Sequence, residues 1–264
     1  MINVMPSKTP VRDLSADCAC VGDSKASEEI PAALFLAEAP VEIGMRTTFL
    51  NRMSAEEYCA LRDIGAEIYV RSDETVFFQG ERHDGIFLIE SGSVRTFYVG
   101  PTGREITLAY WTRGHFVGGP EIYGGGEHIW SGVAAEDCHL LKIGGEPLRR
   151  LVQKSSVLAA GLLEGSIQKG KCYSALLQML GTRSVVERLA QLLLLMSEAG
   201  SKEDDAGVLI DRHLTHEDLA NMVGSTRQWV TATLDKFQAA GAICYVDRKI
   251  LILKSDWLRE KSGM

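Results

Sequence analysis

One stretch decides the fold of the C-terminal part of the chain: L-T-H-E-D-L-A-N-M-V-G-S-T-R-Q-W-V-T-A-T-L-D-K-F-Q-A-A-G-A-I (Leu214–Ile243). Thr215 is a natural N-cap, and Asp218 stands at the third helical position, which is the spacing of a capping box. Gly224 follows the first apolar run, where a helix commonly ends in a left-handed residue. Thr226 starts a second helix, so the stretch predicts two short helices that cross at a glycine turn.

Each of the two predicted helices carries one apolar face, and a hairpin follows them. The inward residues are Leu219, Ala220 and Val223 on the first helix and Val230, Leu234 and Phe237 on the second. The hairpin pairs Ile243–Tyr245 with Ile250–Leu253 around the turn Val246-Asp247-Arg248-Lys249. Two helices and a wing in this order predict a winged helix-turn-helix.

The start of the second helix is the predicted reader of DNA. In a helix-turn-helix this helix enters the major groove, where Arg227 can bind guanine and Gln228 can bind adenine. Helix N-termini and hydroxyls contact phosphates. The predicted DNA-binding residues are Thr215, His216, Ser225, Thr226, Arg227, Gln228, Thr231 and Lys236, with Arg248 and Lys249 as further backbone contacts. A helical hairpin that only packs is the alternative.

The overall charge argues against this prediction at first sight. The 264 residues carry a net charge of −7, and an acidic protein does not bind polyanions non-specifically. Residues 214–254 hold five basic and four acidic side chains, and residues 181–264 hold 11 and 12. The excess acid therefore lies in the first 180 residues, and site-specific binding to double-stranded DNA stays open.

Residues 46–145 are predicted to form an antiparallel β-roll or jelly roll. Short runs rich in β-branched and aromatic residues alternate there with glycine turns. A helix over Ser54–Ile64 precedes them, and its Ser54 and Glu57 have capping-box spacing. The predicted strands are Glu67–Val70, Val76–Phe78, Gly85–Glu90, Val94–Val99, Glu105–Tyr110, Ser131–Ala134 and His139–Ile143.

A long helical pattern follows the roll. Apolar and small residues recur at steps of three and four from Leu148 to Leu180, which predicts one helix over residues 146–181. A stripe of this length is typical of a seam between subunits, so we expect a homodimer, with packing on the chain's own roll as the alternative. A helix over Ser184–Glu198, a polar loop over Ala199–Gly207 and a strand over Val208–Ile210 come next.

These patterns predict an α+β protein in four parts. They are a weakly structured arm over residues 1–45 with a short helix at Ala32–Ala39, the roll over 46–145, the long dimerisation helix over 146–181 and the winged domain over 182–264. Six scattered cysteines suit a reducing cytoplasm. The longest apolar runs are far shorter than the ~20 residues of a membrane span, so we expect no membrane partner.

The chain resembles the CRP/FNR family of bacterial transcription regulators over about residues 49–254. The resemblance rests on I-F-L-I-E-S-G-S-V-R (Ile86–Arg95), G-H-F-V-G-G (Gly114–Gly119), the long helix and the helix-turn-helix. It implies a homodimer whose roll binds an effector and which regulates RNA polymerase from a near-palindromic site. The family pattern Ser/Thr-Arg-Glu-x-x-x-Arg is met by Thr226 and Arg227, whereas Gln228 and Ala232 depart from it.

The resemblance does not extend to the residues that hold cAMP. Gly119 stands where such members have their ribose-binding Glu, and Ile129 where they have their phosphate-binding Arg. A cyclic phosphate would be buried without its cation, so cAMP is disfavoured as the effector. We expect an undetermined small-molecule, gas or redox signal. The predicted pocket wall consists of Arg104, Tyr110, Gly118, Glu121, Tyr123 and Trp130.

Two alternatives involve metals. A haem-based gas sensor of the same family would need an axial ligand, for which His83, His115 and His128 are candidates. An iron–sulfur site would have only Cys18, Cys20 and Cys138 in the usual regions, fewer than four thiolates. An enzymatic metal-binding barrel is the reading from a different class. The sequence lacks the H-x-H pair of such barrels, so no catalytic or metal residue is predicted.

Overall fold

The computed structural model describes residues 48–119, 121–198, 201–204, 207–211 and 213–263. The predicted arm, its helix over Ala32–Ala39 and the two cysteines Cys18 and Cys20 lie outside the described residues. The described chain begins with a short 3-10 helix, η2 (Leu50–Arg52), and helix α1 (Ala55–Ile64).

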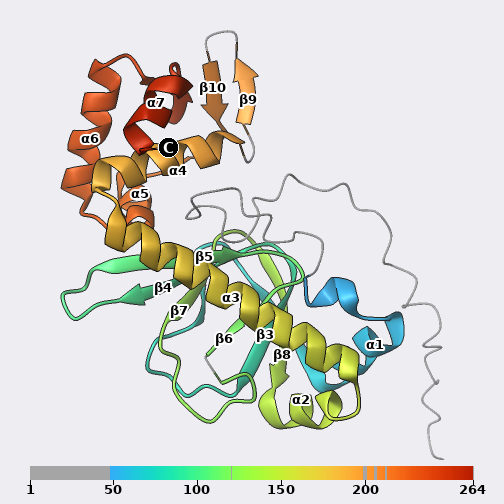
Figure 1. Cartoon of the computed structure of the whole chain (residues 1–264). Helices are drawn as coiled ribbons and strands as arrows, with labels where there is room; N and C mark the ends of the chain where they lie inside the picture. The colour runs from blue at the N-terminus through green and yellow to red at the C-terminus, as the bar shows by residue number, and fades with distance from the viewer. Residues whose placement is uncertain (1–47, 120, 199–200, 205–206, 212, 264) are drawn as a thin grey trace, which may run out of the picture.

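Two four-stranded antiparallel sheets form the predicted jelly roll, which confirms the fold class (Figure 1). β3 is buried on both faces over Gly85–Ile89, whereas β4 alternates, as a strand with one face on the core does. The first sheet has the order β1 (Gly65–Val70), β8 (Cys138–Gly144), β3 (Gly85–Ser91), β6 (Phe116–Gly118). The second has β2 (Thr75–Phe77), β7 (Ser131–Ala134), β4 (Val94–Val99), β5 (Glu105–Trp111). Of these strands only β6 was not predicted, because its three residues fall among Gly114 and Gly118-Gly119, which read as turns.

Trp111 anchors the core of the second sheet. The side chain is 1% exposed, and its indole Nε1 donates to the hydroxyl of Thr96 at 3.0 Å. That hydroxyl in turn donates to the carbonyl of Ala109 at 3.3 Å. Because its one polar atom is satisfied, the large ring contributes apolar burial without leaving a donor unpaired.

The single helix predicted over residues 146–181 is wrong in one respect: the structure has two helices, α2 (Gly145–Val152) and α3 (Ser156–Thr182). Ser155 separates them in extended conformation and caps α3, accepting from the amide of Leu158 at 3.2 Å. The hydroxyl of Ser155 also donates to Glu57 Oε1 at 2.7 Å, and Glu57 completes the capping box of α1 with Ser54. One serine therefore starts α3 and ties it to α1.

α3 packs on its own roll with one face only. Leu158, Leu162 and Cys172 are buried against the roll core, although the sequence pattern assigned the two leucines to a stripe between subunits. Leu163, Ile167 and Leu177 lie on the opposite side and are 63%, 49% and 73% exposed. One face of α3 therefore packs on the chain's own roll, as the alternative prediction had it. The opposite face is also apolar, and no residue of the described chain covers it.

The C-terminal part is a winged helix-turn-helix with one strand and one helix more than predicted. β9 forms within the predicted polar loop and pairs with β10, and α7 ends the described chain. The sheet has the order β11-β12-β10-β9. The elements are α4 (Val185–Glu198), β9 (Ser201–Asp204), β10 (Gly207–Ile210), α5 (His216–Val223), α6 (Arg227–Ala239), β11 (Ile243–Val246), β12 (Lys249–Ile252) and α7 (Ser255–Ser262).

The roll and the winged domain contact each other directly. In Figure 1 the β4–β5 hairpin lies beneath α5, and α5 packs against β5. Leu108 and Tyr110 of β5 are half-buried against the core of the winged domain. None of the described helices is long and apolar enough to span a membrane.

Candidate nucleic-acid interface

The helix-turn-helix is built by two caps and a glycine. Thr215 accepts from the amide of Asp218 at 3.0 Å, and the Asp218 carboxylate accepts from the Thr215 amide at 2.8 Å, which completes the predicted capping box. Gly224 has φ 60° and ψ 48°, the left-handed conformation expected at the turn. Thr226 caps α6 by accepting from Trp229 N at 3.3 Å. All six predicted inward residues are buried: Leu219, Ala220, Val223, Val230, Leu234 and Phe237.

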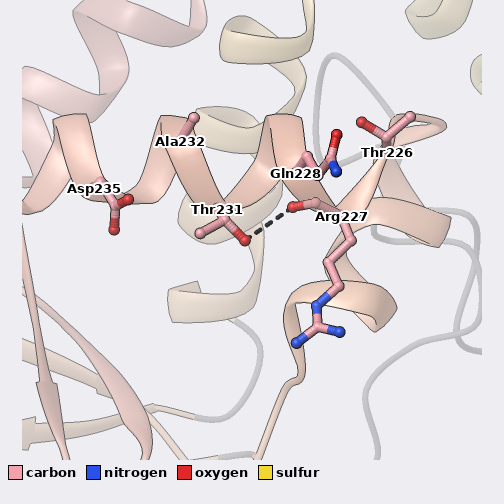
Figure 2. Close-up of a pocket in the computed structure, with 6 residues that line it drawn as sticks. All are labelled: Thr226, Arg227, Gln228, Thr231, Ala232 and Asp235. Atoms are coloured by element: carbon pink, nitrogen blue, oxygen red, sulfur yellow. Dashed lines mark hydrogen bonds between the residues drawn. The ribbon is translucent and has the colours of Figure 1, made fainter.

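The outer face of α6 forms an open groove of about 630 Å³. Figure 2 shows the side chains of this face along the length of the helix, with Arg227, Thr231 and Asp235 directed to one edge and Gln228 and Ala232 to the other. Arg227 and Gln228 are exposed. Within the described residues neither side chain forms a hydrogen bond that would have to break before it could bind a base, since only the backbone carbonyl of Arg227 is bonded, to Thr231. The groove is lined by Thr226, Arg227, Gln228, Thr231, Ala232 and Asp235.

Thr231 and His216, predicted as independent contacts, are linked to each other. The Thr231 hydroxyl donates to the carbonyl of Arg227 at 2.9 Å, the bond dashed in Figure 2, so its oxygen accepts from His216 Nδ1 at 2.8 Å. The other ring nitrogen of His216 lies 3.3 Å from the hydroxyl of Tyr245 in the wing. Burial, and secondarily the charge of Asp235, raise the pKa of Tyr245. This chain of polar groups fixes α6 relative to α5 and the wing.

The other predicted DNA-binding residues differ in their surroundings. Ser225 is 7% exposed and lies within the turn, whereas Thr215 and Lys236 are exposed. In the wing, Asp247 and Arg248 have φ 48° and 64°, as in a type I′ turn, and leave Arg248 exposed. Lys249 is paired with Asp211. Lys236 and Arg248 are thus the more available cations.

Two features of the reading helix were missed from sequence. Asp235 lies seven residues, or two helical turns, after Gln228 and lines the same groove. The spacing i, i+3, i+4 and i+7 from Gln228 is the signal that would have found it. Trp229 is 57% exposed on the flank of α6.

The six residues predicted to line an effector pocket do not converge. Arg104 donates to the carbonyl of Gly224, and Tyr110 packs on the winged domain, so both lie at the junction of the two domains. Tyr123 lies under Arg149, with the guanidinium carbon 5.0 Å from the ring centroid. Trp130 packs against Tyr173 of α3 with ring centroids 5.8 Å apart. Gly118 and Glu121 both contact His83.

His83 occupies the region where the carboxylate of a cyclic-nucleotide site would stand. Its Nδ1 accepts from the amide of Gly119 at 3.2 Å, and its Nε2 bonds the carbonyl of Glu121. A Cβ built on Gly119 would lie 2.5 Å from the His83 ring. The imidazole therefore closes against the backbone at this point.

The three candidate haem histidines lie in different environments. Both ring nitrogens of His83 are bonded, and His115 Nδ1 lies 3.1 Å from the Thr112 carbonyl. Burial, aided by the charge of Lys169, lowers the pKa of His115 to about 4. His128 stacks on Phe77 with centroids 4.4 Å apart, and its buried Nδ1 has no hydrogen-bond partner among the residues that the structure describes. No group of three or more ligand-type side chains suited to a metal ion occurs in the described part of the chain.

The chain matches two family models and several regulators. The cyclic nucleotide-binding domain model matches residues 67–155, and the Crp-like helix-turn-helix model matches residues 187–261. The cyclic AMP receptor protein of Thermus thermophilus is 27% identical over 210 residues, which are 80% of this chain and 87% of that protein. The global nitrogen regulator of Synechococcus elongatus is 24% identical over 181 residues, 68% and 82% of the two chains.

A solved structure has the same fold. The c-di-GMP-responsive global regulator CLP of Xanthomonas campestris is 21% identical and superposes with a TM-score of 0.68, covering 75% of this chain and 99% of that one. The sequence matches and the structure both place a roll before a helix-turn-helix, and the structure contains the capping box that the sequence predicts for the latter. The chain belongs to the CRP/FNR family of transcription regulators, with a cyclic nucleotide-binding-like domain and a DNA-binding helix-turn-helix.

Proposed function

We propose that the protein is a homodimeric, sequence-specific regulator that reads a near-palindromic DNA site with α6 and that a signal sensed by its roll controls this binding. The observation that carries the proposal is the groove-lining face of α6, where Arg227 and Gln228 are exposed at the N-terminal end. A guanidinium suits the two acceptors of guanine and a carboxamide suits adenine. The same face predicts the order of bases that each subunit reads.

Asp235 adds a base preference to this half-site. Its carboxylate lies on the groove-lining face of α6 and is repelled by phosphates. A carboxylate in the major groove is stabilised when it accepts a hydrogen bond from the amino group of cytosine. We infer that Asp235 contributes to specificity and weakens binding to other sequences.

The exposed face of α3 supports a dimer. Its members are spaced by four, three, four, three and four residues, which is the a/d spacing of a two-stranded coiled coil. The seam combines large apolar residues with small ones, which let two helices approach closely. The face consists of Leu163, Ile167, Gly170, Ser174, Leu177 and Gly181, all exposed. Two α3 helices paired there would present two α6 helices to one DNA duplex, hence a near-palindromic site.

The roll is the proposed sensor, and recruitment or blocking of RNA polymerase in the cytoplasm is the proposed output. Trp130 and Tyr173 contact each other between the roll and α3. Any effector that separates these rings changes how α3 lies on the roll, and α3 leads directly into the winged domain (Figure 1). The relatives are regulators and not enzymes, which supports a non-catalytic role.

The decisive experiment is selection of genomic fragments by the purified protein, followed by footprinting. We expect one footprint with two related half-sites, and Arg227→Ala should lose about 1–3 kcal/mol at one base position. Arg150→Ala is the matched control, because Arg150 is an exposed arginine on α2 that pairs with Glu146. Failure of every fragment to survive competitor DNA would refute the proposal, and a uniform loss over all sequences would reduce Arg227 to a phosphate contact.

A further inference from the structure

The hydroxyl of Thr231 is committed to contacts inside the winged domain. It donates its one proton to the carbonyl of Arg227 at 2.9 Å, and its oxygen accepts from His216 Nδ1 at 2.8 Å. A hydroxyl has a single proton to give, so Thr231 has none left for a phosphate oxygen or for an acceptor on a base edge. In Figure 2 the methyl group of this side chain points away from the bond to Arg227.

Contacts with α5 and the wing keep the hydroxyl in this position. A threonine in a helix divides between two rotamers, and the bond of its hydroxyl to a carbonyl of the preceding turn selects one of them. His216 adds a second bond, and its own Nε2 lies 3.3 Å from the hydroxyl of Tyr245 in the wing. Turning the Thr231 hydroxyl toward the groove would break both of its bonds and leave the half-buried imidazole without its acceptor. The group that Thr231 offers to the groove is therefore its methyl.

The middle of the groove-lining face of α6 is apolar. Ala232, toward the other edge of the groove, is exposed and has no polar atom in its side chain, so neither it nor Thr231 donates a hydrogen bond to a base there. The polar side chains of the face lie before and after this level, Arg227 with Gln228 at one end and Asp235 at the other. A polar base edge held against methyl groups would lose its water without gaining a hydrogen bond. The apolar group that the major groove displays is the C5-methyl of thymine, and 5-methylcytosine carries its methyl on the same ring carbon.

We propose that the methyl group of Thr231 contacts the C5-methyl group of a pyrimidine, so that each half-site carries thymine or 5-methylcytosine at the base step that faces the middle of α6. The inference rests on the proposed function, because only a helix in the major groove reaches this methyl group. It adds a chemical class of base to that function: a site with cytosine at this step binds more tightly once the cytosine is methylated. Methylation of the DNA therefore changes the affinity of such a site without a change of sequence.

The test uses the full-length protein and duplexes of the site that genomic selection yields. Each thymine is replaced in turn by deoxyuridine, which removes only the C5-methyl group, and affinity is measured by fluorescence anisotropy of the labelled duplex. At one position of a half-site we expect deoxyuridine to weaken binding about 4-fold, and about 15-fold when both half-sites are changed, the value of burying one and two methyl groups. Cytosine placed at that position should bind more weakly than 5-methylcytosine by a similar factor.

Variants of Thr231 separate the methyl group from the hydroxyl. Thr231→Ser keeps the hydroxyl and its two bonds but loses the methyl, so it should bind thymine and deoxyuridine about equally. Thr231→Val loses the hydroxyl and keeps a methyl group, so its overall affinity should fall while its preference for thymine over deoxyuridine persists. This preference is a ratio measured within one protein, so a partly unfolded variant still reports it. Thr182→Ser is the matched control, because the Thr182 hydroxyl makes the same bond four residues back, to the carbonyl of Gln178 at 2.8 Å, but on α3.

Equal binding of thymine and deoxyuridine at every position of the half-site would overturn the inference, as would a Thr231→Ser protein that keeps the wild-type preference. A protein that selects a site through Arg227 but ignores the methyl group refutes only the contact made by Thr231. A protein that selects no fragment over competitor DNA refutes the proposed function and this contact together. The two failures are therefore distinguishable.

Discussion

Gly224 shows how much of the DNA-binding unit depends on a single residue. Its backbone is left-handed, and a Cβ there would lie 2.6 Å from the Cδ2 of Leu180 in α3. Gly224→Ala should therefore lower the free energy of unfolding by about 1–3 kcal/mol, from backbone strain and crowding together. Urea unfolding measures this directly. Gly100→Ala is the control, since Gly100 has no positive φ and ordinary contacts; an equal loss there would contradict the explanation.

Gln228 is the residue at which the base preference should be switchable. Gln228→Glu restores the acid of the family pattern, and a carboxylate accepts from the amino group of cytosine where a carboxamide pairs with adenine. We expect the preferred base at that position to change, with discrimination of about 1–3 kcal/mol, while the Arg227 position keeps its guanine. Selection of binding sites from a randomised library compares the two proteins. An unchanged preference would show that Gln228 does not face a base.

At the residue scale the sequence predicted which residues lie on the outer face of α6, but not the hydrogen bonds that they and their neighbours make within the protein. Arg227 and Gln228 follow from their place after the N-cap Thr226, which is local information. The bond between His216 and Thr231 joins residues 15 apart and depends on the angle at which α5 and α6 cross. Arg104, predicted as a pocket residue, instead bonds Gly224, 120 residues away. Contacts of this range depend on domain docking, which no local pattern encodes.

Helices and strands with a regular sequence pattern were predicted from the sequence. Elements whose position depends on contacts with distant residues were not. The capping boxes of α1 and α5 and the apolar alternation of β4 identified these elements. β9 reads S-K-E-D and has no strand pattern, because pairing with β10 supplies its hydrogen bonds. The break before α3 was hidden by continuous helical spacing. Only the bond between Ser155 and Glu57 of α1 reveals why the chain turns there.

The exposed seam of α3 predicts a dimer that one charge should disrupt. Leu177→Glu places two carboxylates across the paired helices and removes apolar burial, so the dissociation constant of the dimer should rise by at least about 100-fold. Sedimentation equilibrium measures it, and DNA affinity should fall with it. Gln178→Glu is the control, because Gln178 is exposed one residue off the seam. A Leu177→Glu protein that stays dimeric would place the interface elsewhere.

The charge of the whole molecule predicts the salt dependence of DNA binding. Few cations are available near α6 and the wing, because Lys249 is paired with Asp211, and the rest of the chain is acidic. About three phosphate contacts per subunit would give a slope of about −5 in a plot of log affinity against log salt for the dimer. Titrations between low and moderate salt test this. A slope twice as steep would show that further basic residues, away from α6 and the wing, also contact DNA phosphates.

Stability should rise with pH above neutrality because of Lys169. Its ammonium lies 3.9 Å from the centroid of Trp111, and burial lowers its pKa to about 7 from about 10.5. The unfolded chain therefore holds more protons between these values, so the free energy of unfolding increases with pH, by at most about 1.4 kcal/mol per pH unit. The trend is clearest between about pH 7 and 8. Burial raises the pKa of Cys138 and of Cys172 from 9.0 to about 11, so these thiols ionise first in the unfolded chain and oppose the trend from about pH 9.

Urea unfolding at pH 7, 8 and 9 compares the wild type with Lys169→Met and with Lys171→Met, an exposed lysine two residues away. Lys169→Met should flatten the pH dependence and Lys171→Met should leave it intact. Equal slopes in all three proteins would show that the amine of Lys169 keeps its ordinary pKa.

The contact between His83 and Gly119 constrains how this roll can change over evolution. A Cβ introduced at Gly119 would lie 2.5 Å from the present imidazole, so the ring would have to turn away and give up its bonds to Gly119 and Glu121. A smaller residue at position 83 would remove this conflict. Substitutions at positions 83 and 119 are therefore expected to occur together.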